Sequence, residues 1–222
     1  MEKLVEWAGK ITDEDLRSIV LDFLRDPPSD LDVPALPIGV CPAGAYQHHC
    51  YSGGLVEHTL SVVGLCMSLC DIVEEQYGGS VDRNLVLAGA ILHDVMKVYC
   101  YEETEDGGYR TSEFGGLVDH LSLMIAEMHR RGLPLGLMHV IAGHHGDAGA
   151  TKPKTLEALI VSVADQADSD LNGKLLRAAE YLLRRSGVSR PVLKSAKEAL
   201  DVVQVKRSEG WDGLKRMLDD EG

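Results

Sequence analysis

The chain has 222 residues, of which 45% are hydrophobic, and a formal net charge of −13 at neutral pH. This is the composition of an ordinary globular protein with a sizeable core. The longest uninterrupted apolar run, LVLAGAIL at residues 85–92, is far shorter than the roughly 20 residues that span a bilayer. The N-terminus, MEKLVEWAGK, lacks the apolar core of a signal peptide, so we expect a cytoplasmic protein with no membrane partner.

The charge is distributed unevenly along the chain. Residues 171–222 contain 11 Lys and Arg against 8 Asp and Glu, whereas residues 1–170 contain 11 against 27. Because an acidic surface repels polyanions over about a Debye length, we expect no strong long-range binding of nucleic acid. Metal cations held by the protein would change the local sign of the charge.

The apolar pattern predicts an all-α protein. Residues 2–25 show helical spacing in two short stretches, and residues 26–54 form a long irregular connector with five of the eight prolines. The segment VYCYEETEDGGYRTS, residues 98–112, predicts one small β-hairpin because β-prone residues flank a central DGG. Further helices are predicted at roughly 55–77, 82–97, 117–131, 135–146, 154–171, 173–186, 190–205 and 209–218.

The five cysteines are an odd number without paired spacing, which indicates free thiols rather than a disulfide framework. Cys66 and Cys70 lie four residues apart. They either face the core together or bind a metal, and the core interpretation is favoured.

Four predicted helices direct histidines or aspartates toward the core. His58, for example, shares its helix face with Val62, Leu65 and Leu69. Similar spacing from apolar neighbours predicts that the other inward side chains are those of His93, Asp94, His144, His145 and Asp165.

A single inward histidine is usually a hydrogen-bonded core residue. Together, however, these imidazoles and carboxylates have few Lys or Arg on matching faces, which leaves negative charge that cations neutralise at low cost. Mixed imidazole and carboxylate ligands suit Mn, Fe, Ni, Co or Zn better than Ca or Mg. The residues therefore predict a divalent transition-metal site that holds one or two ions.

The order His58, His93-Asp94, Asp165 resembles the H…HD…D signature of the HD-domain metal-dependent phosphohydrolases, an all-helical superfamily that hydrolyses phosphate esters of nucleotides and related compounds. Met96 stands where that family usually has glycine in HDxGK, a difference that leaves the metal ligands unchanged. Five blocks also resemble, in order and spacing, the HD half of YhaM-type 3′–5′ exoribonucleases: HHCYSGGLVEHTLSV (48–62), DRNLVLAGAILHDVMKV (82–98), LVDHLSL (117–123), HVIAGHHG (139–146) and KTLEALIVSVADQADSDLN (154–172).

This resemblance implies an HD-domain helical bundle and two neighbouring divalent ions. Carried over by motif position, the first ion would be held by His58, His93, Asp94 and Asp165. The second would be held by Asp94, His120, His144 and His145. Asp94 would bridge the two ions, which suits cations roughly 3.5–4 Å apart that act on one phosphoryl group.

Three further residues have candidate roles. Lys97, three residues after Asp94, is either a helix C-terminal lysine or a contact to a substrate phosphate, and the resemblance favours the second. His49, in the loop before the helix of His58, is a surface residue or a substrate-binding residue, and we expect the latter. Asp168 is expected to orient a ligand histidine by a hydrogen bond to the ring nitrogen that does not bind metal.

These observations predict one domain over residues 1–222, with an HD-like core at about 42–172 and helices 2–25 and 173–218 packed on it. The predicted function is metal-dependent hydrolysis of phosphate esters of a nucleotide or short oligonucleotide by a metal-activated water, catalysed with Asp94 and Lys97. The alternative is a catalytically weak or inactive module that binds metal and nucleotide and serves a regulatory or partner-binding role. The partner is a phosphorylated small molecule or short oligonucleotide, and the chain is free to form an oligomer.

Overall fold

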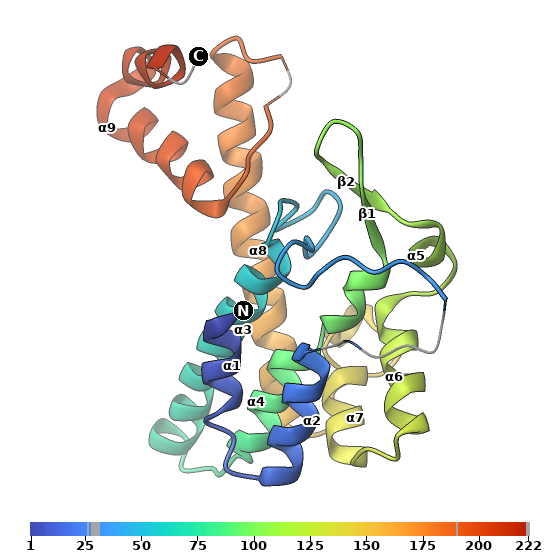
Figure 1. Cartoon of the computed structure of the whole chain (residues 1–222). Helices are drawn as coiled ribbons and strands as arrows, with labels where there is room; N and C mark the ends of the chain where they lie inside the picture. The colour runs from blue at the N-terminus through green and yellow to red at the C-terminus, as the bar shows by residue number, and fades with distance from the viewer. Residues whose placement is uncertain (26, 28–31, 190, 221–222) are drawn as a thin grey trace.

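The computed structural model describes residues 1–25, 27, 32–189 and 191–220. It is a bundle of α-helices with one two-stranded antiparallel hairpin (Figure 1), which confirms the predicted fold class. The helices are α1 (Glu2–Ala8), α2 (Glu14–Arg25), α3 (Gly54–Asp71), α4 (Arg83–Leu92), α5 (Glu113–Leu117), α6 (His120–Arg130), α7 (Leu135–Ala142), α8 (Leu156–Arg185) and α9 (Ala196–Asp220). The hairpin pairs β1 (Tyr101–Glu103) with β2 (Tyr109–Thr111), inside the predicted segment.

The N-terminal helices cover one side of the main core. In α2, the apolar residues Leu16, Val20, Phe23 and Leu24 recur at helical spacing and all are buried. This face packs on α4, and α1 packs on α2, α3 and α4. The two short helical stretches predicted within residues 2–25 are therefore part of the main core.

The centre of the fold is formed by α3, α4, α7 and α8, which pack against one another. Gly89 of α4 permits a close approach of α7, because a Cβ atom there would lie 2.3 Å from Cγ1 of Val140 in α7. In α3, His58 and Val62 are buried as predicted, whereas Leu65 is 37% exposed. The buried face of α3 runs instead through Thr59, Val63, Cys66 and Cys70, so it is rotated from the predicted line toward these residues.

The segment predicted as a helix over 82–97 contains two elements. Asp82 caps α4 by accepting a hydrogen bond from the backbone N–H of Leu85, and α4 ends at Leu92. Asp94 then leaves the helical region, with φ −114° and ψ 1°, before a 3₁₀ helix at Val95–Tyr99. The HD pair thus lies at a break in the helix, in a backbone region where active-site residues are common.

The two helices predicted at 154–171 and 173–186 are one continuous helix, α8. The predicted break between residues 171 and 173 was wrong, because Gly173 serves packing rather than a turn. A Cβ atom at Gly173 would lie 2.8 Å from the carbonyl oxygen of Gln47 in the preceding irregular segment. Glycine therefore lets this segment lie directly on α8.

The C-terminal part of α8 and the kinked helix α9 form a second, smaller core. Leu176, Ala179 and Leu183 of α8 pack there with Ala199 and Leu214 of α9. The kink is at Gly210, where φ is 73°. Figure 1 shows this pair of helices extending away from the main bundle.

Among the described residues, one segment, Gly54–Gln76, is long and apolar enough to cross a membrane by length and composition alone. Most of it is α3, which packs against α4 and α8, and core helices of globular proteins meet the same criteria. The five cysteines are free thiols, as predicted. Cys66 and Cys70 both lie in the main core, and no group of candidate metal ligands among the described residues includes them.

Candidate metal centre

A first cluster of ligand atoms lies between α3, the end of α4 and α8. The Nε2 atom of His58 lies 3.2 Å from Nε2 of His93 and 3.2 Å from Oδ1 of Asp165. His93 Nε2 lies 3.8 Å from the same Asp165 oxygen. Three side chains from three helical segments therefore present one ligand atom each to a common point.

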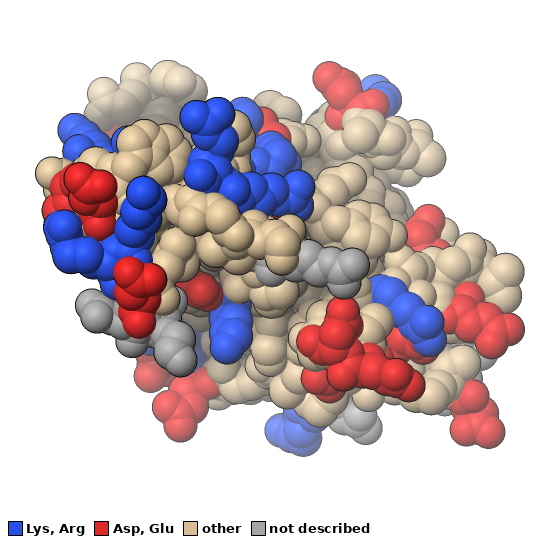
Figure 2. Space-filling model, turned by 90° about the horizontal axis from the view of Figure 1, so that it is seen from above, with Lys and Arg blue, Asp and Glu red and all other residues tan. Residues whose placement is uncertain are grey.

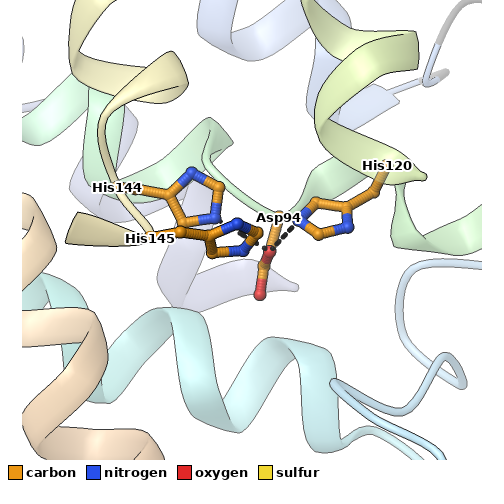
Figure 3. A group of neighbouring side chains, drawn as sticks. All are labelled: Asp94, His120, His144 and His145. Atoms are coloured by element: carbon orange, nitrogen blue, oxygen red, sulfur yellow. Dashed lines mark ion pairs between the residues drawn. The ribbon is translucent and has the colours of Figure 1, made fainter. Parts of the chain in front are cut away.

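A second cluster lies beside the first and includes Asp94, His120, His144 and His145. Figure 3 shows the three imidazoles converging on the Asp94 carboxylate from α6 and from the turn after α7. Nε2 of His120 lies 3.1 Å and Nε2 of His144 3.7 Å from Oδ1 of Asp94. His120 is the first residue of α6, whose N-terminus is fixed because Asp119 accepts a hydrogen bond from the Ser122 N–H.

Asp94 lies between the two clusters. Its Oδ1 faces His120 and His144, while its Oδ2 lies 3.4 Å from Nε2 of both His58 and His93. The structure thus brings together all seven residues that the sequence analysis proposed as ligands, in the two groups proposed there.

Hydrogen bonds behind the clusters determine which nitrogen of each histidine faces inward. His93 and His144 each place Nδ1 against a backbone carbonyl, of Ala90 at 2.9 Å and of Ile141 at 2.6 Å. A carbonyl only accepts, so each Nδ1 carries a proton that it donates, and in the neutral ring the lone pair is on Nε2. His58 Nδ1 lies 2.7 Å from Oδ2 of Asp168, which fixes its ring in the same way.

The polar atoms that converge here are better explained as metal ligands than as hydrogen-bond partners of one another. Asp94 Oδ1, His120 Nε2 and His144 Nε2 are buried and have no hydrogen-bond partner among the described residues. Buried polar atoms without partners are costly, and most have a protein, water or ion partner. A donor set of imidazole nitrogens and carboxylate oxygens is the one expected for a divalent transition metal.

The buried carboxylates of the two clusters also favour a positive charge between them. Burial opposes the charged form of His58, but the carboxylates of Asp165, Asp168 and Asp94 outweigh it and raise the pKa of His58 to about 10. Burial opposes the charged form of Asp94 too, yet Lys97 and His93 hold its pKa well below the ordinary range. Without metal, a proton on His58 supplies part of the charge that the carboxylates require.

Lys97 is a buried lysine whose ammonium group has two partners. It is buried, its Nζ lies 2.6 Å from Oδ2 of Asp94, and it donates a hydrogen bond to the carbonyl oxygen of Ala43 at 2.7 Å. Burial opposes the charged form of Lys97, but Asp94 outweighs it and raises the pKa. The side chain also lines the cleft above the clusters, so its predicted contact with substrate stays a prediction that its position permits.

The loop before α3 places two histidines differently. His49 is the one described non-glycine residue with positive φ, at 45°, and it is only 2% exposed. Its backbone N–H donates to Oδ1 of Asn172 in α8, and its Nε2 lies 3.6 Å from Asp168. His49 does not line the cleft, whereas its neighbour His48 does. The proposed substrate contact of His49 stays a prediction, and His48 is the better placed of the two.

The clusters open into a cleft with a volume of about 430 Å³. Its floor includes Asp94, His120, His145 and Asp165, and its walls come from the loop 43–48, the hairpin and α8. The lining residues that the sequence did not single out include Tyr46, Tyr101, Thr111, Ser169 and Arg177. Ser169 could have been found, since it follows Asp165 by four residues, about one turn of the helix.

A helical bundle with adjacent imidazole and carboxylate clusters, in a cleft that contains a buried lysine, is the arrangement expected of a metal-dependent phosphohydrolase. Residues 55–170 match the HD domain family, and the chain belongs to that family. These residues lie within the core predicted at 42–172. The predicted class of enzyme is thus confirmed, and the chain's HD clusters could hold divalent metal.

Two similar enzymes indicate which phosphohydrolases this chain resembles. The chain is 39% identical over 214 residues to the dihydroneopterin 2′,3′-cyclic phosphate phosphodiesterase of Methanocaldococcus jannaschii. This alignment covers 95% of this chain and 85% of that enzyme. It is 32% identical over 142 residues to the 3′-5′ exoribonuclease YhaM of Bacillus subtilis, covering 59% of this chain but only 43% of that enzyme. No solved structure matches the chain.

Proposed function

We propose that the chain is a phosphodiesterase that uses two divalent transition-metal ions to open a cyclic phosphate of a small, heterocycle-bearing molecule. His58, His93, Asp94 and Asp165 would hold one ion, and Asp94, His120, His144 and His145 the other. The observation that carries the metal assignment is the convergence of buried, partnerless atoms on Asp94. When bound, such ions lower the pKa of water and stabilise charge on phosphoryl oxygens.

The chain's own side chains prepare the site for that chemistry. Asp168 holds His58 so that its Nε2 faces the cluster, and the carbonyls of Ala90 and Ile141 do the same for His93 and His144. Lys97 keeps Asp94 ionised through its 2.6 Å ion pair and presents positive charge to the cleft. A phosphoryl group that enters the cleft therefore meets ligands whose orientation is already fixed, which reduces the entropy lost on reaction.

The cleft supports a small substrate. Its volume, about 430 Å³, is in the range of sites for single small molecules. The relative that aligns with nearly the whole chain acts on a cyclic phosphate, and that alignment includes the helices beyond the HD domain. The YhaM relatives share a shorter region, so a short oligonucleotide is the rival substrate.

The direct test supplies metal-stripped protein with Mn²⁺, Fe²⁺, Co²⁺, Ni²⁺ or Zn²⁺ and dihydroneopterin 2′,3′-cyclic phosphate. Phosphorus NMR follows conversion of the cyclic diester to the monoester, and elemental analysis gives metal atoms per chain. We expect ring opening with two ions bound, and loss of turnover on chelation or in Asp94→Asn. Asp201→Asn, which changes a half-buried acid of α9 paired with Lys197, is the matched control and should retain activity.

Other results would contradict the proposal. Mononucleotide release from short single-stranded RNA, without opening of the cyclic phosphate, would assign the rival substrate. Retained activity in Asp94→Asn would remove the carboxylate from its proposed bridging position. Folded, metal-loaded protein without turnover of either substrate would favour the inactive binding module.

A further inference from the structure

The outer part of the cleft contains one cation whose role the metal chemistry does not explain. Arg177 lies on α8 beyond the segment that matches the HD domain, and it lines the same cleft as Asp94 and Asp165. The other cation of the cleft, Lys97, is already engaged with Asp94 and Ala43. Arg177 is therefore available to a ligand in a way that Lys97 is not.

The other basic side chains of α8 all have partners. Lys174 and Arg184 each lie near an acid of the same helix, and Arg185 lies over the ring of Trp211. Arg177 makes no hydrogen bond or ion pair with any residue that the structure describes. In the view from above, Lys and Arg gather over the side formed by the C-terminal helices (Figure 2), but Arg177 is the one that reaches the cleft.

The position of its guanidinium is set by Gly173. Nη1 of Arg177 lies 3.3 Å from the point that a Cβ atom of Gly173 would occupy, so the head group lies over this glycine. Asp165, Ser169 and Gly173 follow one another at steps of four on one face of α8. At 1.5 Å per residue, the guanidinium is about 12 Å along the helix from the metal ligand Asp165.

An exposed aromatic ring also lines this cleft. Tyr46 lines the cleft and is 77% exposed. The next residue, Gln47, contacts α8 at Gly173, which places the loop 43–48 beside the Arg177 guanidinium. Planar rings stack on tyrosine, and a guanidinium donates two parallel hydrogen bonds to the oxygen and nitrogen edge of a heterocycle.

We propose that Arg177 and Tyr46 form a subsite for the heterocycle of the substrate, with Tyr46 stacking on the ring and Arg177 donating to its acceptor edge. The assignment rests on the proposed cyclic phosphodiesterase function, and it adds which part of the substrate determines specificity. The metal clusters would receive the cyclic phosphate, and the outer cleft would select the group that carries it.

The test compares dihydroneopterin 2′,3′-cyclic phosphate with glycerol 1,2-cyclic phosphate, which has the same five-membered ring without the heterocycle. Loss of a hydrogen bond from a charged donor predicts that Arg177→Gln lowers kcat/KM for the heterocyclic substrate roughly tenfold to a hundredfold. The ratio of kcat/KM between the two substrates should fall by a similar factor. Tyr46→Ala should lower the same ratio. Arg184→Gln, which removes the same charge from α8 outside the cleft, should leave the ratio unchanged.

A second measurement separates failure of the subsite from failure of the proposed function. Equilibrium dialysis measures binding of dihydroneopterin itself, which requires no turnover, and we expect weaker binding in Arg177→Gln. Equal losses on both cyclic phosphates, or unchanged dihydroneopterin binding, would overturn the subsite. If a 5′-phosphate on a nucleoside 2′,3′-cyclic phosphate gains an advantage that Arg177→Gln removes, then Arg177 binds a second phosphate and the heterocycle assignment is wrong.

Discussion

At the scale of single residues, three of the proposed metal ligands, His58, His93 and His144, are held by hydrogen bonds through their Nδ1 atoms. His58 is the clearest case, since its Nδ1 is held by Asp168 while its Nε2 faces His93 and Asp165. The carboxylates around it outweigh the effect of burial and raise its pKa to about 10 in the metal-free protein. A metal that binds here must therefore displace a proton.

That displacement predicts the pH dependence of metal binding. Below the raised pKa of His58, a metal releases about one proton on binding, so its apparent affinity should fall about tenfold for each pH unit of acidification. Asp94, Asp165 and His144 add little to this proton release, because the pKa of each is lowered. Calorimetric titration with Mn²⁺ in buffers of different ionisation enthalpy counts the protons released.

Asp168→Asn provides the matched variant for this prediction. It removes one of the carboxylates that raise the His58 pKa but keeps an oxygen that can accept from Nδ1. At about pH 8.5 we expect fewer protons released than in the wild type, together with a loss of roughly 10-fold to 100-fold in metal affinity. An unchanged proton count would mean that His58 is not the group that the metal deprotonates.

The sequence indicated that these residues would lie together because their pattern is local. His93 and Asp94 follow an apolar run, and Asp168 lies one turn after Asp165, so their shared environment could be inferred. No such local pattern places Tyr46 and Arg177 in the same cleft. Their proximity arises from the contact of Gln47 with Gly173, which joins segments more than 120 residues apart and leaves no periodic signal.

At the scale of helices, glycine determines how closely the ligand-bearing elements approach. Gly89 of α4 faces Val140 of α7 and Val161 of α8, and these three helices lead to His93, His144 and Asp165. The sequence predicted the helices but read glycines as punctuation. The same error divided α8 into two helices, since a glycine that serves packing and one that ends a helix look alike in sequence.

Gly89→Ala tests this packing. The added methyl would lie 2.3 Å from Cγ1 of Val140, so we expect the free energy of unfolding to fall by about 1–3 kcal/mol. The control is Gly64→Ala in α3, where a Cβ atom meets nothing within 4 Å. Because alanine favours a helix over glycine, this control should gain up to about 1 kcal/mol. Urea unfolding of metal-free protein measures both, and equal effects would show that Gly89 is not a packing contact.

At the scale of the whole molecule, the fold consists of two hydrophobic cores joined by one helix. The main core contains residues of α1–α4, α6 and α7 together with Ala158, Val161 and Ala164 of α8. The second core contains Leu176 and Leu183 of the same helix. Tyr51, from the loop before α3, is buried in the second core and accepts a hydrogen bond from Asn172. Substrate recognition by Arg177 would thus depend on an element that both cores stabilise.

The prediction that residues 1–222 form one domain can be tested by following the unfolding of both cores. The chain has two tryptophans, and they lie in different parts of the fold. Trp7 of α1 packs against the main core, whereas Trp211 lies on α9 near Arg185 of α8. If α8 couples the cores, urea unfolding of metal-free protein should give coincident midpoints for the two tryptophans, as expected of a two-state transition.

Single-tryptophan variants make the comparison direct. Trp211→Phe leaves only the fluorescence of Trp7, and Trp7→Phe leaves only that of Trp211. Circular dichroism on each variant reports the loss of helix and corrects for any change in stability that the substitution itself causes. Because α8 runs unbroken through both cores, melting of α9 alone would expose Leu176 and Leu183 to water, which is unfavourable. A Trp211 transition at lower urea than the circular dichroism transition of the same variant would show that the C-terminal helices are a separate folding unit.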